Sequence, residues 1–291
     1  MRAFIAKFYH KGKKYKAGSL KPRRFSGIFF KVGIINNTSL IFAVRPPDTP
    51  PIVRMEICMF KYEIHLHSSA CSACAVSTAE EMVAAAKEKN YAGVAFTNHF
   101  YCGNTAVDRK LSWREFVEAY EQDYLRAAKV GKALDIDVFF GIETVYEPGK
   151  EALIYGIEPE LIKNAPFLKG CGIEQLSEFV RKNGGFIAAA HPLRRRDYIP
   201  DPDKEPDMRY FDAIEAYNLG NTDEDNQRAF DFARRKKVPA ISSGDVHNKE
   251  NLGKSGLAFF ERLYTPERLV EALKKQRYRL IIDGKIIEDL P

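Results

Sequence analysis

The sequence has no long uninterrupted apolar run. Its most apolar stretch, from Gly27 to Val44, is broken by Lys31 and by a polar segment at residues 36–39, whereas a membrane-spanning helix needs about 20 consecutive apolar residues. The basic amino terminus also lacks the apolar core and the small-residue cleavage site of a secretory signal. We therefore expect no contact with a membrane and a cytoplasmic location.

Cysteine is scarce, and its number is odd. Five cysteines in 291 residues are too few for a disulfide framework in a chain of this length, so we expect reduced thiols. Cys71 and Cys74 have the spacing of a zinc or redox motif, but the sequence contains no second such pair. We interpret both as small buried thiols.

The composition is that of an ordinary globular protein. The 45% of hydrophobic and 29% of charged residues exclude wholesale disorder, collagen and coiled coil. A chain of 291 residues accommodates one barrel-sized domain with an appendage. The net charge of +6 is unevenly placed, because residues 1–54 hold twelve Lys and Arg against a single acid, Asp48.

Residues 1–54 are a basic, proline-rich extension of the body at 55–291. The segment 45–51 has the composition of a linker, and the apolar segments 28–35 and 40–44 predict a hairpin of marginal stability. A basic arm can bind nucleic acid through phosphate contacts, but we favour a linker. Because Met55 and Met59 stand directly before the body, we also hypothesise that translation starts at one of them.

From residue 60 onward, apolar runs alternate with amphipathic segments. A capping-box pattern at Ser77 and Thr78 predicts a helix start, and alternating strands and helices predict a parallel sheet with helices outside. The predicted strands are 61–65, 91–97, 137–142, 152–155, 186–190, 213–217 and 238–242. Three helices are predicted over residues 113–128, 173–182 and 223–235. Two further helices are predicted to begin near residue 79 and at Thr265-Pro266.

The histidines of the body follow these predicted strands. Five of them fall in four short clusters, and a fifth strand ends in Gly141-Ile142-Glu143. Because the strands of a β/α barrel open on one face at their carboxyl ends, these side chains should converge. The clusters are His65-x-His67, Thr97-Asn98-His99, Ala190-His191-Pro192 and Gly244-Asp245-Val246-His247.

Imidazoles and carboxylates are the ligands that Zn²⁺, Mn²⁺ or Fe²⁺ require, and a carboxylate such as Glu143 can bridge two ions. A single His-x-His is more often a surface or core feature than a metal site. Five strand ends that carry such groups together indicate one. Glu215 and Asn218, which end another predicted strand, are interpreted as lining the pocket or supporting the ligands.

The ordered set of clusters resembles the metal-binding signature of the polymerase and histidinol phosphatase (PHP) superfamily. The resemblance implies a distorted (β/α)₇ TIM-like barrel with a metal site at the carboxyl-terminal face of its strands. It also implies two, or even three, divalent ions. His65, His67, Glu143 and Asp245 would hold the first, Glu143 and His191 the second, and His99 and His247 would face a third.

Two positions depart from the family pattern. Members commonly carry an acid or histidine seven or eight residues after the first histidine, where this chain has Ser72 and Ala73. Many also have a histidine where this chain has Ala152 and Leu153. The second and third ion positions are therefore each one ligand short, and Glu151 or water is the expected substitute.

The function that the resemblance implies is hydrolysis of phosphate esters by a metal-activated hydroxide. The substrate would be a small phosphomonoester, similar to histidinol phosphate or a nucleotide. Asp245, His99 and His247 are the catalytic candidates, and either imidazole could protonate the leaving oxygen. Arg194, Arg195 and Arg196 follow His191-Pro192, so at least one guanidinium is a candidate for binding the substrate phosphate.

Two other functions stay open from the residues. The barrel could be catalytically degenerate and bind nucleic acid or a partner through the basic extension, since two ligand positions are unfilled. A related metal-dependent amidohydrolase is the third alternative, because fold alone does not determine function.

Overall fold

The computed structural model describes residues 59–288 continuously and five strands within the segment before them. In that segment β1 (Lys7–His10) pairs with β2 (Lys13–Lys16), while β3 (Lys31–Ile34), β4 (Ser39–Ala43) and β5 (Ile52–Glu56) form a second antiparallel sheet. The pairing of β3 with β4 confirms the predicted hairpin. The proline-rich segment 45–51 lies outside the described residues. The chain divides into two units, residues 1–59 and 60–291.

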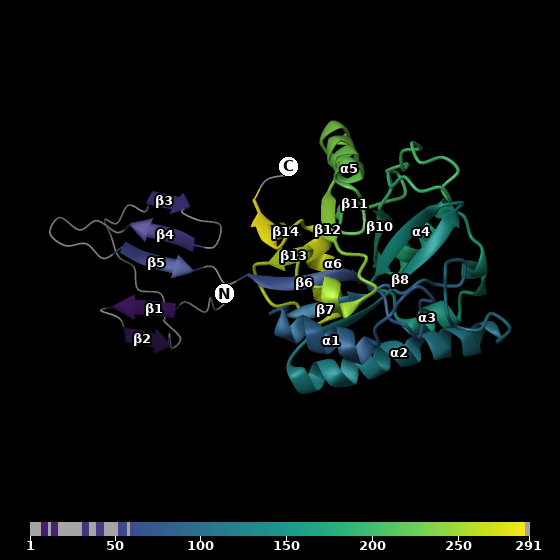
Figure 1. Ribbon diagram of the computed structural model, residues 1–291, viewed down its shortest axis with the longest axis horizontal. Helices are drawn as coiled ribbons and strands as arrows, with labels where there is room; N and C mark the ends of the chain where they lie inside the picture. Colours follow the sequence, from purple (N-terminus) through teal and green to yellow (C-terminus); the bar gives the residue numbers. More distant parts are fainter. Residues whose placement is uncertain are drawn as a thin grey trace. The chain divides into compact units, whose positions relative to one another are not determined.

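The second unit is a mixed α/β structure in which helices cover a curled sheet (Figure 1). Its strands are β6 (Phe60–Leu66), β7 (Gly93–Phe96), β8 (Asp137–Glu147), β9 (Lys150–Tyr155), β10 (Phe186–Ala190), β11 (Ala213–Asn218), β12 (Ala240–Ser243), β13 (Gly256–Phe259), β14 (Tyr278–Ile282) and β15 (Lys285–Ile287). Its α-helices are α1 (Ala79–Glu88), α2 (Trp113–Leu134), α3 (Pro159–Lys163), α4 (Ile173–Lys182), α5 (Asp223–Lys236) and α6 (Pro266–Lys274).

The sheet is only partly parallel. Its order is β12-β11-β10-β9-β8-β7-β6-β13-β14-β15, and the pairs β6–β7, β7–β8, β10–β11 and β11–β12 are parallel, as predicted. The prediction is wrong for β9, which runs antiparallel to both neighbours. The physical reason is the two-residue turn at Pro148 and Gly149, where Gly149 has φ of +72°, because so short a connection can form only a hairpin. The strands β13–β15, which were not predicted, add an antiparallel meander beside β6.

The curl brings the segment after β12 against the end of β6. Val246 forms a parallel bridge with Leu66. Its N–H donates to the carbonyl of His65 at 3.1 Å, and its carbonyl accepts from the N–H of His67 at 2.9 Å. Asp245 and His247 therefore flank a residue that is hydrogen-bonded to the backbone of both β6 histidines. The exact (β/α)₇ count remains a prediction.

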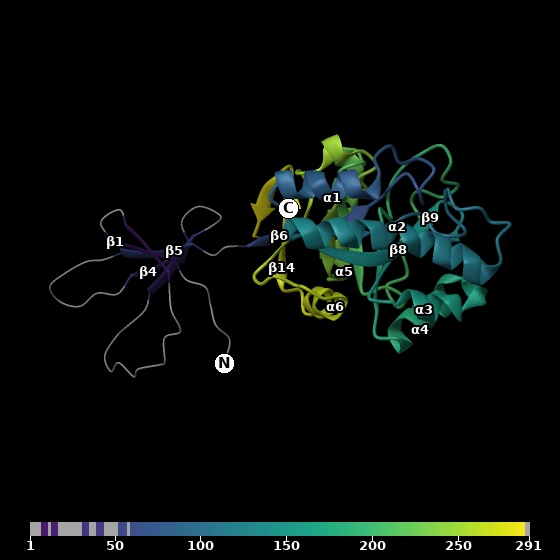
Figure 2. The ribbon, with the colours of Figure 1, turned by 90° about the horizontal axis from the view of Figure 1, so that it is seen from below.

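Helices α1 and α2 lie side by side along the sheet (Figures 1 and 2). Thr78 begins α1 and forms the predicted capping box with Glu81. Ser77 does not cap this helix; its hydroxyl accepts from the N–H of Lys249 at 3.0 Å. The amphipathic pattern predicted over 113–128 is confirmed as α2, which continues to Leu134.

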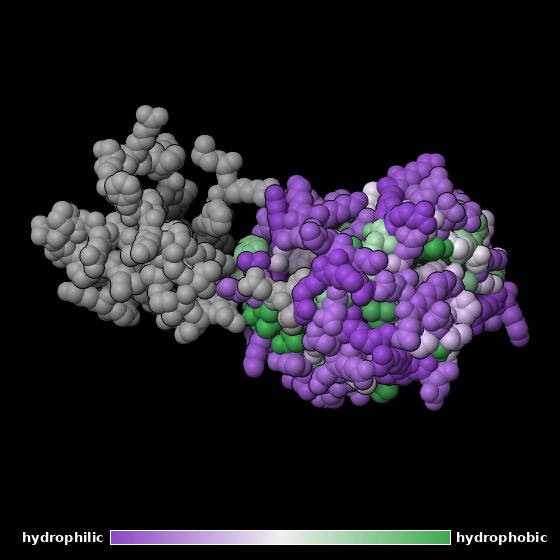
Figure 3. Space-filling model, turned by 90° about the horizontal axis from the view of Figure 1, so that it is seen from above, coloured by the Kyte–Doolittle hydropathy of each residue, from purple (hydrophilic) through white to green (hydrophobic). Residues whose placement is uncertain are grey.

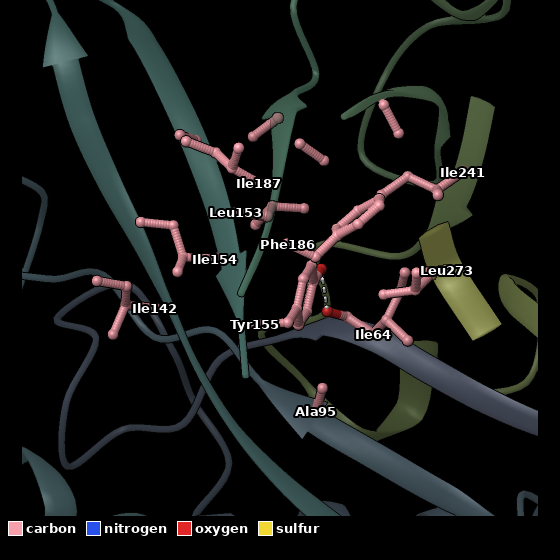
Figure 4. Packing of buried hydrophobic residues seen from close by; sticks show 14 of the residues in the cluster. Ile64, Ala95, Ile142, Leu153, Ile154, Tyr155, Phe186, Ile187, Ile241 and Leu273 are labelled. Carbon is pink, nitrogen blue, oxygen red and sulfur yellow. Dashed lines mark hydrogen bonds between the residues drawn. The ribbon is translucent and has the colours of Figure 1, made fainter. Parts of the chain in front are cut away.

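The interior of the curl is filled by apolar side chains. Tyr155 on β9 reaches across it, and its hydroxyl donates to the carbonyl of Ile64 on β6 at 2.8 Å (Figure 4). This bond joins two strands that are not neighbours in the sheet. The outer face seen in Figure 3 is predominantly hydrophilic. Among the described residues, none of the helices combines the length and apolarity needed to cross a membrane.

A buried carboxylate on β6 holds the curl together. Glu63 Oε1 accepts from the backbone N–H groups of Ile64, His65 and Gly244 at 2.9, 3.1 and 2.9 Å. Its Oε2 accepts from the Ser255 hydroxyl at 2.5 Å. Burial raises the pKa of Glu63 to about 7. The carboxylate thus connects β6 to the segments that follow β12 and precede β13.

We expect Glu63→Ala to lower the free energy of unfolding by about 3 kcal/mol, because each buried N–H left without an acceptor costs about 1–3 kcal/mol. Chemical denaturation of the full chain in a chelator measures this without a contribution from bound metal. The matched control is Glu88→Ala, at an exposed helix end, where a change within about 0.5 kcal/mol is expected. Equal stabilities of the two variants would contradict the role given to Glu63.

Candidate metal centre

The structure brings all seven predicted ligand side chains together at one end of the parallel strands. His65 lies near the carboxyl end of β6 and His67 just beyond it, while His99 follows β7 and forms a bridge with Glu143 on β8. His191 follows β10, and Asp245 and His247 follow β12. Apart from Asp245 and His247, which are partly accessible, these residues are buried.

Glu143 is the centre of the cluster. Its Oε1 lies 3.2 Å from His65 Nε2 and 3.0 Å from His191 Nε2. Its Oε2 lies 2.8 Å from His99 Nδ1 and 3.5 Å from His67 Nε2. One fully buried carboxylate therefore faces four imidazoles, which is the placement of a ligand shared between ions.

Asp245 forms a second focus. Its Oδ1 lies 3.4 Å from His65 Nε2 and 3.1 Å from His67 Nε2. His65 and His67 thus stand between two carboxylates, Glu143 and Asp245. These four side chains are the set that the family resemblance implies for a first ion.

Several ligand atoms of the cluster lack any other partner. His65 Nε2, His67 Nε2, His99 Nδ1 and Glu143 Oε2 are buried and make no hydrogen bond. Leaving such an atom unsatisfied costs about 1–3 kcal/mol. Groups of three ligand atoms, each within 4.8 Å of one another, occur repeatedly here. A divalent cation that accepts imidazole and carboxylate donors fits this arrangement.

The protonation states of His67 and Glu143 suit a cation, whereas the neighbouring carboxylates raise the pKa of His65 and His99. Burial lowers the pKa of His67 to about 3, so its imidazole is neutral and keeps a lone pair. Burial alone would raise the pKa of Glu143, but His65 and His99 hold this pKa well below its usual range. A neutral imidazole and an ionised carboxylate are the forms that bind metal.

The ring orientations are fixed from outside the cluster. Glu215 Oε1 lies 2.7 Å from His65 Nδ1, and Ser72 Oγ lies 3.0 Å from His67 Nδ1. His247 Nδ1 lies 2.8 Å from the carbonyl of Asp245. Because Nδ1 is engaged in each ring, Nε2 is the atom left for a metal. Glu215, which also accepts from the N–H of His191 at 2.7 Å, therefore supports two ligands from β11.

Two of the ligand candidates have an unusual backbone. His191 has φ of +28° and Asp245 has φ of +53°, which is the left-handed region that residues other than glycine rarely adopt. Such conformations cost about 1–3 kcal/mol and concentrate at functional sites. Both occur at the turn directly after a strand, where they direct the side chain into the cluster.

Glu151 on β9 also joins the cluster. Its Oε1 lies 3.6 Å from His99 Nδ1 and its Oε2 3.5 Å from His191 Nε2, and it groups with His99 and Glu143. Burial and the neighbouring Glu143 raise its pKa to about 7. A carboxylate that can share a proton with its neighbours thus lies next to Ala152 and Leu153, the positions where the family pattern has a histidine.

The two cysteines of the Cys-x-x-Cys pattern have different surroundings. Cys71 is buried, as predicted, and burial raises its pKa. Cys74 is exposed, so the prediction of a buried thiol is wrong for it. Burial would raise the pKa of Cys74, but hydrogen bonds with His247 and His99 lower it to about 6. Spacing alone could not reveal this, because His99 and His247 are distant in sequence.

The three consecutive arginines diverge. Arg194 is buried, and its Nη2 donates to Asp245 Oδ2 at 2.7 Å and to Asn218 Oδ1 at 3.0 Å. Arg195 pairs with Glu224 at 2.5 Å, and Arg196 donates to the carbonyls of Arg195 and Gly220. Of the three, Arg194 is the one that contacts a ligand candidate.

Comparison with known proteins agrees with this geometry. The family model described as PHP domain matches residues 63–282. A two-domain protein of Bacteroides vulgatus, described as containing a predicted PHP-like metal-dependent phosphoesterase, is 14% identical with a TM-score of 0.59, over 79% of this chain and 67% of that chain. This likeness shows the fold.

Two further solved structures are similar over 65% of this chain and 88% of their own. One is a protein of Bifidobacterium adolescentis whose activity as a metal-dependent phosphoesterase is inferred. It has 13% identity to this chain and a TM-score of 0.46. The other is an amidohydrolase from Chromobacterium violaceum, at 14% identity and a TM-score of 0.45. No curated protein matches the chain.

We expect Glu215→Gln to weaken divalent-metal binding by about 10- to 100-fold, because loss of the carboxylate partner of a ligating histidine has effects of this size. Titration of the metal-free chain with Zn²⁺ or Mn²⁺, followed by calorimetry, measures the change. Glu224→Gln removes an exposed carboxylate from the neighbouring helix and should bind metal like the wild type. Unchanged affinity in Glu215→Gln would show that His65 does not depend on this contact.

Proposed function

The chain belongs to the PHP domain family, and on this premise we propose that it is a metal-dependent hydrolase of phosphate esters that acts on a small phosphomonoester. The observation that carries the proposal is the set of unpartnered, buried ligand atoms around Glu143. These atoms lie 2.8 to 3.5 Å from atoms of the same cluster, whereas a structural core would orient them so that they form hydrogen bonds with one another. Their common orientation is instead that of a site prepared for cations.

We assign the ligands by position. His65, His67, Glu143 and Asp245 would hold a first ion. Glu143 and His191 would hold a second, with Glu151 in place of the histidine that the family pattern has there. His99 and His247 would face a third. Zn²⁺, Mn²⁺ and Fe²⁺ all accept such donors. Bound ions would supply Lewis acidity, which lowers the pKa of water and stabilises charge on phosphoryl oxygens.

The chain's own residues orient these groups and handle protons. Glu215 and Ser72 hold His65 and His67 with Nε2 toward the centre. His99 and His247 lie toward the open side, with side chains 11% and 26% exposed. An imidazole there could protonate the leaving oxygen of the substrate. Whether these two rings act as acids or as ligands depends on whether the third position is filled.

Arg194 is the candidate for binding the substrate phosphate. Its guanidinium is adjacent to Asp245 and therefore borders the cluster. Burial opposes its charge, but Asp245 keeps it protonated. Its Nε and Nη2 already donate to protein oxygens, so Nη1 is the nitrogen that would donate to a phosphate oxygen. Arg195 and Arg196 point to other partners and are weaker candidates.

Removal of the first ion should abolish activity. We expect His65→Ala and Asp245→Ala to lose bound metal and to lower kcat/KM for nitrophenyl phosphate by more than about 100-fold, because outer contacts alone account for up to that factor. A chelator should do the same to the wild type, and added metal should restore it. Elemental analysis and phosphate release are the measurements.

The matched control is Asp231→Asn, an exposed carboxylate on α5, which should keep both metal and activity. A panel that includes amides and single-stranded nucleic acid separates the phosphoesterase from an amidohydrolase and from a binding protein. Full activity in both ligand variants, or turnover of amides alone, would refute the proposal.

Arginine substitutions test substrate binding. We expect Arg194→Gln to weaken inhibition by inorganic phosphate by about 10- to 100-fold and to retain bound metal. This factor corresponds to the loss of one hydrogen bond to a charged group, which contributes about 1.5–3 kcal/mol. Arg195→Gln and Arg196→Gln should change it less than about 3-fold. If Arg194→Gln loses metal and keeps its affinity for phosphate, the arginine serves Asp245 and not the substrate.

A further inference from the structure

A buried carboxylate on α2 makes contacts that the proposed chemistry does not use. Asp123 is 1% exposed. Its Oδ2 accepts from the Ser68 hydroxyl and, at 3.4 Å, from Asn98 Nδ2. Ser68 directly follows His67 and Asn98 directly precedes His99, so Asp123 contacts a neighbour of each of two candidate ligands.

The hydrogen bonds continue from Asn98 to the ring of His67. Asn98 Oδ1 accepts from the backbone N–H of Ser68 at 2.7 Å and from the Ser72 hydroxyl at 3.0 Å. Ser72 Oγ lies 3.0 Å from His67 Nδ1 and accepts from the N–H of His99 at 3.0 Å. A hydroxyl has one hydrogen to donate and two lone pairs. Because the Ser72 hydrogen goes to Asn98, the Ser72 oxygen must accept from His67, so the hydrogen of the neutral imidazole lies on Nδ1.

Asp123 determines where the Ser72 hydrogen goes. The Ser68 hydroxyl has two acceptors within reach, which are Asp123 Oδ2 and, at 3.2 Å, Asn98 Oδ1. The carboxylate is the stronger acceptor, because ionised groups form stronger hydrogen bonds than neutral ones. With Ser68 bound to Asp123, Asn98 Oδ1 keeps a lone pair for the Ser72 hydrogen. Without Asp123, Ser68 would take that lone pair, and the Ser72 hydroxyl would turn to His67 Nδ1.

Helix α2 also fixes the orientation of Asn98. The hydroxyl of Tyr120, one turn before Asp123, donates to the carbonyl of Asn98 at 2.6 Å. The same carbonyl accepts from the N–H of Glu143 at 3.0 Å. Only the nitrogen of the side-chain amide can donate to Asp123, so the amide oxygen must face Ser72.

We propose that Asp123 is a positioning residue of the metal centre, and that it fixes which nitrogen of His67 carries the hydrogen. It acts through the three residues between them, Ser68, Asn98 and Ser72. The Nε2 lone pair is then left facing the two carboxylates of the centre, at 3.5 and 3.1 Å, where a cation would bind. This inference rests on the proposed function, since it concerns a ligand of the proposed first ion.

The other tautomer of His67 would oppose metal binding. With its hydrogen on Nε2, the ring would donate to Asp245 Oδ1 and would have no lone pair at the centre. The ring would have to lose that hydrogen before it could bind an ion. Asp123 removes this step in advance, so its loss should weaken metal binding although every ligand is still present.

The test is the position of the hydrogen on His67 in the metal-free full chain. When the six histidines are labelled with ¹⁵N, long-range proton–nitrogen correlation spectra distinguish the two tautomers, and His67→Gln identifies the signals of this ring. The wild type should carry the hydrogen on Nδ1. Asp123→Leu and Asp123→Ala should move it to Nε2, and two substitutions are made so that a folding defect in one leaves the other to decide.

A second substitution separates this role from a purely structural one. In Asp123→Ala, the Ser68 hydroxyl is the group that displaces the Ser72 hydrogen from its acceptor. Adding Ser68→Ala should therefore return the hydrogen of His67 to Nδ1, whereas loss of a second buried hydrogen bond would aggravate a structural defect. The matched control is Glu118→Gln, an exposed carboxylate on the same helix, which should keep the wild-type tautomer.

Calorimetric titration with Zn²⁺ gives the second readout. Asp123→Ala should bind the tightest ion about 10-fold more weakly, the lower end of what supporting contacts of a ligand contribute, and Ser68→Ala should restore most of this loss. A His67 hydrogen on Nε2 in the wild type, or one that stays on Nδ1 in both Asp123 variants, overturns this inference and leaves the proposed function intact. Absence of bound Zn²⁺ in the wild type overturns the proposed function and, with it, the metal role of Asp123.

Discussion

The site is organised around the burial of negative charge. Glu143 is fully buried and stays ionised because imidazoles surround it on both oxygens, and Asp245 repeats the arrangement a short distance away. The neighbouring carboxylates raise the pKa of His65 and His99 against the effect of burial, so these imidazoles take up protons that balance the charge, whereas burial lowers the pKa of His67. A bound cation would supply the same positive charge in place of these protons, since an isolated buried charge is very costly. Most of the hydrogen bonds around the cluster hold the imidazoles and carboxylates in this arrangement.

The curl of the sheet brings the candidate ligands close to one another. The backbone of Val246 is hydrogen-bonded between His65 and His67, so the residues on either side of it arrive beside the two histidines without any help from side chains. Glu63 also ties the same segment to β6, because its Oε1 accepts from the N–H of Gly244. Folding of the body and assembly of the ligand set are therefore one event, and the ligand positions inherit the precision of backbone hydrogen bonds.

Sequence patterns predicted much of this and failed where the cause was not local. The strands, the capping box of α1 and the long α2 follow from apolar spacing and end signals, and the convergence of His65, His191 and Asp245 follows from strand ends on a common face. The direction of β9 did not follow, because a two-residue turn was needed to decide it. The exposed position of Cys74 beside His99 and His247 depends on contacts between segments that are far apart in the chain, and no periodicity records such contacts.

The hairpin of β8 and β9 suggests how a centre of this kind can change its composition over time. Residues 151 and 153 project to the same side of β9 because successive side chains alternate, so a metal-facing group can move by two positions along the strand and still reach the same neighbours. In the assignment proposed above, the carboxylate of Glu151 takes the place of a ring at position 153. Positions two residues apart on a paired strand are thus interchangeable as sites for a ligand. A change in which residue carries the ligand therefore need not alter the strand pairing.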